Sequence, residues 1–439
     1  MHRILGKRVT RIVFLVSVGL FVTAVHSSVK GFRTPNLVTP GTLQAAASSR
    51  PFVIRHARIF DGKRVIAADS VFVQNAKIQS VGKRIKVPSG TEEIDATGDT
   101  LLPGLIDSHT HDWGDSPKQA LLFGVTTELN MACIPKYVAK IKQAEAEGKA
   151  LDAADVLSAG NVVTPPKGHG TEFGVPVPTL ASSAEAQQFV DERIAEGSDY
   201  IKIIYEDGHV CHSPFSKFSR EELAASVAAA HKRGKMAIVH ISTQEDARDA
   251  IAAGADGIAH LFADSAPQSD FAELVRRHHA FVETTLTAIQ SSFGTPSGAS
   301  LSIDHRIAEF LSAGAESNLK ALMPFKCSGE LENALAAAKQ LHDAGVPVLA
   351  GTDAPAPGSW NGASLHGELE LLVRAGLSPL DALAATTSLP ASTFICPTVA
   401  ASRLASGPIS CLSGVTRPMT LSPQGTSLPS GSSGLKLTG

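Results

Sequence analysis

The feature of this 439-residue sequence that most restricts its fold is a series of eight short apolar segments that alternate with helical segments. Strands that alternate with helices predict parallel βα units, and eight such units are the number that closes a (β/α)8 barrel. The composition, with 43% hydrophobic residues, supplies enough apolar side chains for a core of that size. The expected strands are residues 105–111, 125–130, 156–160, 200–204, 236–241, 257–260, 281–286 and 346–351.

The segments between these strands carry the helical period of apolar residues. Residues 219–234, with the sequence SREELAASVAAAHKRG, show a Ser/Glu start and a Gly stop, which are the usual signals at the two ends of a helix. The expected helices include residues 184–196, 220–233, 244–253 and 330–344.

Ahead of the barrel, residues 51–103 read as β structure. The segments FVIRHARIFDG and SVFVQNAKIQSVG alternate apolar and polar residues and are separated by turn residues. We therefore expect an α/β chain in which residues 104–394 form a TIM barrel and residues 51–103 begin a small, antiparallel β-sandwich accessory domain.

The N-terminus has the pattern of a secretory signal peptide. Basic residues precede an apolar run over residues 12–25, and small or polar residues follow it. We expect residues 1–28 to be the signal, residues 29–50 to be a linker, and the protein to be exported to a periplasm or secreted, with no stable membrane insertion after cleavage. The alternative is an uncleaved signal that anchors the chain.

Charge and cysteine content exclude some classes of protein. The net charge is −3, and no basic cluster follows the N-terminus, so nucleic acid is not an expected partner. Five cysteines without a CxxC pair do not imply a disulfide framework, and the plain interpretation is buried or incidental thiols.

Metal-ligand residue types occur at the ends of the expected strands. His109 and His111 are two residues apart, so both face one side of a strand and can share an ion. His240 and His260 each end a short apolar run, and Asp353 follows the last strand. Each residue alone has a structural explanation, because a single histidine is often a hydrogen-bonded core residue and Asp often caps a turn.

Lys202 lies inside an apolar strand, where a charged amine is costly. One interpretation is a lysine at a strand end that reaches solvent. The other is an amine of lowered pKa that is carboxylated by CO₂ and so presents a carboxylate to two ions.

The set His109, His111, Lys202, His240, His260 and Asp353, together with the motifs GTDAP, LHGELELLVRAGLSPLDAL and GHGTEFG, resembles the amidohydrolase superfamily over about residues 52–394. Within it, the chain looks closest to the imidazolonepropionase-like and prolidase-like branches. Imidazolonepropionases usually carry one metal and lack the lysine on the fourth strand. Lys202 therefore favours the dipeptidase and amidase side.

The resemblance implies a site with two divalent metal ions, zinc first, with manganese, cobalt or iron as alternatives. His109, His111 and Asp353 would hold one ion, His240 and His260 the other, and carboxylated Lys202 and a hydroxide would bridge them. Asp353 would act as general base in the hydrolysis of a carbon–nitrogen bond. The substrate would be a small molecule such as a dipeptide, an N-acyl amino acid or a cyclic amide.

Two further residues are candidates for binding the substrate. His169, in the loop GHGTEFG, matches a loop histidine that contacts the substrate in such relatives, and Tyr205 follows Lys202 closely. Two other functions stay open: a mononuclear imidazolonase- or deaminase-like hydrolase, and an inactive exported barrel. Homo-oligomer formation is also left open.

Residues 395–439 do not resemble the family ending, in which strands return to the small domain. They are rich in Ser, Pro, Gly and Thr, which is typical of a disordered extension. A sharper hypothesis is a frameshift near Phe394, because the frame shifted back by one nucleotide permits the string LPDRGRIAPGLRADLVLV from Ile395 onward. That string resembles the family's Gly-Arg-Ile turn and Ala-Asp-Leu-Val strand.

Independent DNA reads over codons 390–400 test this hypothesis. A sequencing error predicts that the family ending appears in the corrected frame. An intact original frame in those reads would rule out the sequencing error.

Overall fold

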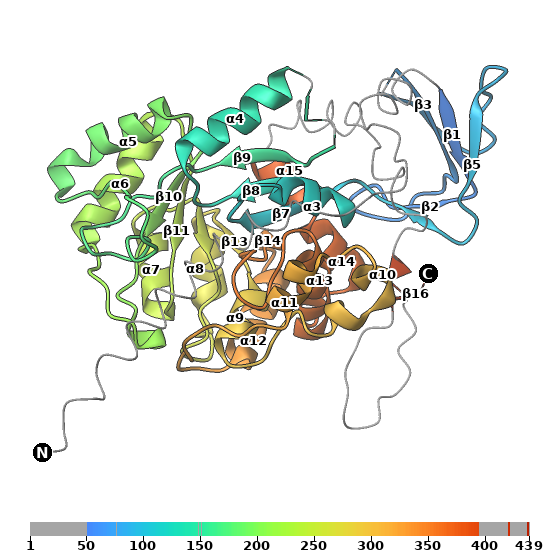
Figure 1. Cartoon of the computed structure of the whole chain (residues 1–439). Helices are drawn as coiled ribbons and strands as arrows, with labels where there is room; N and C mark the ends of the chain where they lie inside the picture. The colour runs from blue at the N-terminus through green and yellow to red at the C-terminus, as the bar shows by residue number, and fades with distance from the viewer. Residues whose placement is uncertain are drawn as a thin grey trace, which may run out of the picture. The chain divides into compact units, whose positions relative to one another are not determined.

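The alternation of apolar and helical segments produces eight successive parallel strands, each followed by one or more helices (Figure 1). The computed structural model describes residues 51–75, 77–147, 149–150 and 152–394, and the backbone of residues 420–421 and 437–438. The strands are β7 (Leu105–Thr110), β8 (Val125–Asn130), β9 (Asp155–Ser158), β10 (Ile201–Ile204), β11 (Ala237–His240), β12 (Gly257–Ala259), β13 (Phe281–Glu283) and β14 (Val348–Leu349).

These strands pair in the order expected for an α/β barrel. One sheet has the order β7-β8-β9 and the other the order β10-β11-β12-β13-β14. Single parallel bridges join the edges of the two sheets, Val163 with Ile203 and Thr110 with Ala354. The barrel predicted from the sequence is thus confirmed as a fold class, although its ladder is interrupted at these two seams.

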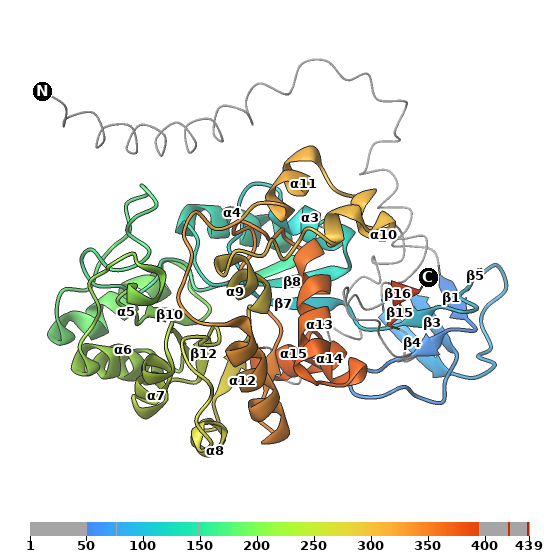
Figure 2. The same ribbon diagram turned by 90° about the horizontal axis from the view of Figure 1, so that it is seen from below.

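The helices follow the strands along the chain and lie outside them in the view of Figure 2. All four helices named from the sequence are present, within two residues at each end. Leu286, expected as the last residue of a strand, begins helix α9 instead. The helices are α3 (Ser116–Leu122), α4 (Pro135–Ala146), α5 (Ala186–Ala195), α6 (Arg220–Lys232), α7 (Gln244–Ala252), α8 (Phe271–Arg277), α9 (Leu286–Ser292), α10 (His305–Ala308), α11 (Ala313–Leu319), α12 (Leu331–Asp343), α13 (Ala363–Ala375), α14 (Pro379–Ala385) and α15 (Ser388–Phe394).

Local sequence explains where two of these helices begin. Ser219 and Glu222 form a capping box at the start of α6, and Thr243 and Asp246 form one at the start of α7. Each box satisfies two backbone N–H groups that a helix start leaves unpaired. The two helices therefore begin directly after the loops that follow β10 and β11, and this fixes the length of those loops.

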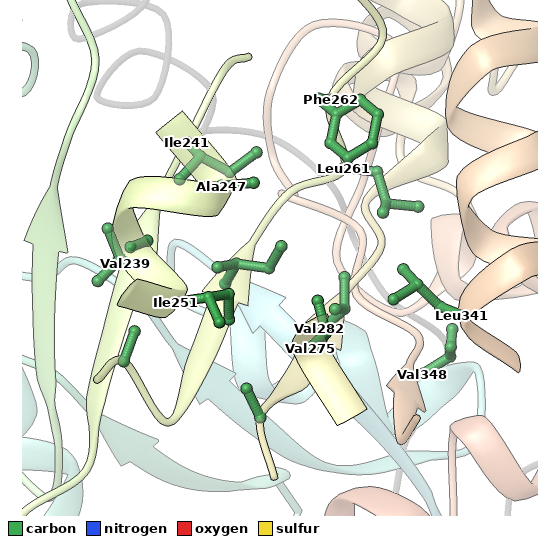
Figure 3. Packing of buried hydrophobic residues seen from close by; sticks show 14 of the residues in the cluster. Val239, Ile241, Ala247, Ile251, Leu261, Phe262, Val275, Val282, Leu341 and Val348 are labelled. Atoms are coloured by element: carbon green, nitrogen blue, oxygen red, sulfur yellow. The ribbon is translucent and has the colours of Figure 1, made fainter. Parts of the chain in front are cut away.

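The hydrophobic core has two layers because side chains alternate along each strand. Outward-facing residues such as Val239 and Val282 pack against the helices, as Figure 3 shows together with Ile251 and Leu341. Inward-facing apolar residues form a second cluster inside the strands, which includes Ile238, Phe281 and Leu349.

The inner cluster ends at α15. The ring of Phe394 lies 5.3 Å from the rings of both Tyr200 and Phe281, measured between centroids. Helix α15 therefore covers one end of the inner cluster, and the polar inner residues collect towards the other ends of the strands.

The small β domain has a mixed sheet. Strands β1 (Phe52–Arg55), β3 (Ser70–Gln74) and β4 (Lys77–Gly82) pair antiparallel, as expected. Strand β5 (Glu92–Asp95), however, pairs parallel to β1, and β2 (Arg58–Ile59) pairs parallel to β6 (Thr100–Leu101). The expectation of a purely antiparallel domain is therefore wrong, because a loop long enough for a crossover separates β4 from β5.

A disulfide bond joins Cys211 to Cys327 across 116 residues. The expectation of incidental thiols is wrong for this pair, because a bond between distant loops leaves no spacing signal in the sequence. Cys133 is free, and Cys396 and Cys411 lie outside the described residues. Disulfides of this kind are typical of oxidising compartments.

The terminal segments are mostly outside the described residues. The expected signal peptide and linker, residues 1–50, lie outside the described residues. Most of residues 395–439, which the frameshift hypothesis concerns, also lie outside them. Within the tail, β15 (Thr420–Leu421) pairs antiparallel with β16 (Leu437–Thr438). Among the described residues, no helix combines the length and apolar character needed to cross a membrane.

We expect Gly257→Ala to destabilise the barrel. A Cβ at this position on β12 would lie 2.4 Å from two ring carbons of Phe281, which is fully packed. Overpacking of this kind costs about 1–3 kcal/mol in the free energy of unfolding. The matched control is Gly82→Ala, where the nearest atom to the added Cβ is 3.9 Å away. Urea unfolding measures both, and equal midpoints for the two variants would contradict the packing argument.

Candidate metal centre

Polar residues occupy inner positions of several barrel strands. Lys202 on β10, His240 on β11 and Glu283 on β13 face inward, while their neighbours Ile203 and Val239 belong to the outer core. The strand period of two thus carries a lysine, a histidine and a carboxylate into one interior. Both Lys202 and Glu283 are buried, at 2% and 0% exposure.

The first group of donor atoms lies where β7 and β14 end. The Nε2 atoms of His111 and His109 lie 3.0 and 3.4 Å from Oδ1 of Asp353. His260 joins them, since the ligand atoms of His109, His260 and Asp353 all lie within 4.8 Å of one another. These four residues were expected as ligands, and the structure brings them together.

The other ring nitrogen of each of these histidines has its own partner. Nδ1 of His109 lies 3.0 Å from Glu283 Oε2, and Nδ1 of His260 lies 2.8 Å from Thr285 Oγ1. Nδ1 of His111 donates to the carbonyl oxygen of Ala132 over 3.3 Å. When Nδ1 carries the proton, Nε2 has a free lone pair, and this is the arrangement typical of metal-binding histidines.

Lys202 lies against the first group. Its Nζ is 3.5 Å from Nε2 of His109. Burial lowers the pKa of the amine to about 8, and the charges of Glu283 and Asp353 offset only part of that effect. The amine therefore has a much larger neutral fraction at pH 7 than an ordinary lysine has.

A second group of donors lies around His240. The ligand atoms of His169, Glu206 and His240 are mutually within 4.8 Å. Nε2 of His240 lies 3.1 Å from Oε1 of Glu206, and Nδ1 of His169 lies 3.6 Å from the same oxygen. His169, expected as a substrate contact, is thus beside a candidate ligand.

Glu206 was not expected from the sequence. It follows β10 at an inner position, four residues after Lys202, and the strand alternation is the signal that could have identified it. Burial alone would raise the pKa of this carboxyl, but His240 and His169 lower it to about 2. The group is therefore a carboxylate at neutral pH.

Tyr205 lies on the other side of the strand. Its hydroxyl donates to Oδ2 of Asp249 on α7 over 2.9 Å, and its ring packs in the outer core. Nζ of Lys217 lies 4.2 Å from the centre of that ring. This differs from the expectation that Tyr205 faces the substrate, because residues 203 and 205 point outward and residues 202 and 206 point inward.

Burial sets the charge of the first group. It lowers the pKa of His109 and of His260 well below the usual value, with Lys202 and His240 as further causes respectively. Burial alone would raise the pKa of Asp353, but its contact with His111 lowers it strongly. Neutral imidazoles beside an ionised carboxylate are the forms that bind a divalent cation.

The loop after β14 is held by a buried carboxyl group. Asp107 accepts from the backbone N–H of Thr352 over 3.1 Å and from its hydroxyl over 2.7 Å, and burial raises the pKa of this acid to about 8. Close by, a Cβ on Gly351 would lie 2.6 Å from Cβ of His109. Glycine is therefore required for the two strand ends to approach each other.

Two residues of the site have left-handed backbone conformations. His260 has φ of 72° and Asp353 has φ of 58°. Such conformations cost of order 1–3 kcal/mol in residues with side chains, and they gather at functional sites. Other histidines lie elsewhere: His366 binds the carbonyl oxygen of Phe123 over 3.0 Å, and residues 231, 278 and 279 are exposed.

The donor set fits divalent metal ions. Imidazole Nε2 atoms and carboxylate oxygens suit zinc and the neighbouring transition metals. The first group supplies three histidines and Asp353, and the second supplies His240 with Glu206 beside it. Lys202 lies against the first group and completes the six residues expected as ligands.

Solved structures share this fold. A Bifidobacterium longum protein assigned as a prolidase matches with a TM-score of 0.61 and 26% identity, over 79% of this chain and 84% of that chain. A Xaa-Pro dipeptidase matches with a TM-score of 0.60 and 21% identity, over 78% and 88%. A. niger ochratoxinase matches with a TM-score of 0.59 and 20% identity, over 79% and 85%.

Curated proteins match over shorter stretches. The dihydroorotase of Geobacter metallireducens is 32% identical over 136 residues, which are 26% of this chain and 31% of that protein. A Listeria monocytogenes dihydroorotase is 33% identical over 75 residues, 17% of each chain. The chain thus spans less than a third of the length of these relatives. Residues 100–395, more than half of the chain, match the model of the Amidohydrolase family, and the chain therefore belongs to the amidohydrolase family.

Proposed function

We propose that this protein hydrolyses a carbon–nitrogen bond of the amide type in a small molecule, using two divalent metal ions. The observation that carries the proposal is the convergence of six residues on one interior, with the Nδ1 atoms of three histidines already engaged elsewhere. The substrate classes are dipeptides, N-acyl amino acids and cyclic amides. The prolidase and dipeptidase likeness of the fold supports the first class.

The ions would be held in two places. His109, His111 and Asp353 would bind one ion, His240 would bind the other, and a carbamate on Lys202 would bridge them. The ring of His260 lies 4.5 Å from the rings of both His109 and His240, between centroids, so it stands between the two places. The lowered pKa of Lys202 supports the carbamate, because only a neutral amine reacts with CO₂.

The chemistry follows from the charge of each group. Divalent ions, when bound, lower the pKa of water and polarise a carbonyl group. Asp353 is ionised and partly buried, so it can accept a proton from the attacking water and return it to the leaving amine. Glu283 orients the ring of His109 through its contact with Nδ1 over 3.0 Å.

A second candidate function is a hydrolase with a single ion. The observation that favours it is that His109, His260 and Asp353 are by themselves a compact three-donor group, which is enough to hold one ion. The two functions differ in the role of Lys202, which bridges two ions in the first and has no metal role in the second. An inactive barrel is the third possibility, and it predicts little bound metal.

We expect Lys202→Ala to remove one of two bound ions and to abolish hydrolysis, because the bridge between the ions is lost. The measurement is metal content by mass spectrometry after loading with zinc or manganese and bicarbonate. Activity is read against a library of dipeptides, N-acyl amino acids, lactams and lactones. Lys339→Ala is the control, since its amine forms an exposed pair with Asp343 on α12. A Lys202→Ala protein with one ion and full activity would favour the single-ion function.

We also expect the metal-free protein to be reconstituted faster at higher pH. The neutral fraction of an amine with a pKa of about 8 rises close to tenfold per pH unit below that value and levels off above it. The rate of carbamate formation at fixed dissolved CO₂ should follow that curve. Recovery of activity after mixing with metal is timed between pH 6 and pH 9, and a pH-independent rate would contradict carboxylation as the slow step.

A further inference from the structure

Glu206 is a buried carboxylate that the assignment above does not use. Its side chain is 9% exposed, and its ion pairs within 4.0 Å are with His240 and His169. A buried carboxylate needs compensating charge or strong hydrogen bonding, which His240 and His169 supply to Glu206 in the metal-free protein. A cation at this point would compensate the charge directly.

The spacing of the donor atoms fits a shared ion. Oε1 of Glu206 lies 3.1 Å from Nε2 of His240. Two donors at that distance subtend about 95° at an ion bound with lengths of ~2.1 Å, an ordinary angle between neighbouring ligands. The pair His111 and Asp353, at 3.0 Å, has nearly the same spacing in the first group.

The other carboxylate in this region does not share the feature. Oε1 of Glu172 lies 2.6 Å from Nδ1 of His169, and Oε2 accepts from the N–H of Gly170 over 2.6 Å. Glu172 is thus engaged with its own loop, and its ion pair is with His169 alone. Of the two, Glu206 is the one that approaches the Nε2 atom of His240.

We propose that Glu206 is a ligand of the metal ion that His240 binds, in addition to the ligands assigned above. The inference rests on the proposed two-ion function and deepens it. An extra carboxylate lowers the net charge of the second site and ties that ion to the protein through a group that needs no carbamate.

The test measures metal binding by Glu206→Gln, which keeps the shape of the side chain and removes its charge. Purified protein is loaded with zinc, dialysed against a weak chelator and analysed for metal per chain. Losing a partner outside the ligand shell typically costs 10–100-fold in metal affinity, so we expect the second ion to bind at least ~100-fold more weakly. Glu172→Gln is the matched control and should retain two ions.

A spectroscopic measurement makes the result independent of activity. Two Mn²⁺ ions that share a bridge give an exchange-coupled paramagnetic signal, whereas one ion gives an isolated signal. We expect the coupled signal in the wild type and in Glu172→Gln, and the isolated signal in Glu206→Gln. Urea unfolding of the metal-free proteins separates loss of a ligand from loss of the fold, and Glu206→Asp provides a second variant if Glu206→Gln unfolds.

Three outcomes overturn the proposal. If Glu206→Gln retains both ions with affinity within threefold of the wild type, Glu206 is not a ligand, while the two-ion function stands. If it retains both ions and KM rises only for substrates with a free amino group, Glu206 is a substrate contact. A wild-type protein that holds a single ion contradicts both this inference and the two-ion function.

Discussion

The hydrogen bond between His109 and Glu283 is the interaction on which the rest of the site depends. It joins the first strand of the barrel to the seventh, over 3.0 Å, and both side chains are fully buried. Four imidazoles lie with neighbouring ring centroids 4.5–5.5 Å apart, too close for all of them to carry charge. Burial lowers the pKa of His109 and keeps its ring neutral, and a proton on Nδ1 leaves the Nε2 lone pair free for a cation.

A second set of contacts connects the site to the helices around the barrel. Glu368 on α13 accepts from the backbone N–H groups of Leu286 and Thr287 over 2.9 and 2.8 Å. These contacts hold the loop after β13, and that loop presents Thr285 to Nδ1 of His260. The orientation of a donor histidine therefore depends on a carboxyl group in the helical layer, and burial raises the pKa of that carboxyl to about 7.

Periodicity was enough to predict the barrel, whereas the six donor residues were singled out by residue type at the strand ends together with the resemblance to a known family. Strands such as β8 coincide with the predicted range, because apolar runs between helical segments leave few alternatives. Contacts between distant segments were harder to predict from the sequence. The parallel pairing of β5 with β1 and the disulfide between Cys211 and Cys327 join segments whose sequences do not indicate which partner each one has. Glu206 and Tyr205 show the same limit on a finer scale, since one residue of register decides which of them faces the interior.

The position of helix α15 bears on where the sequence of the barrel ends. Phe394 covers one end of the inner cluster against Tyr200 and Phe281, and it is also the residue at which the family-like sequence stops. A side chain that covers the inner cluster thus comes immediately before the junction with the tail. A gene lesion just downstream of codon 394 leaves unchanged the three residues that make these contacts.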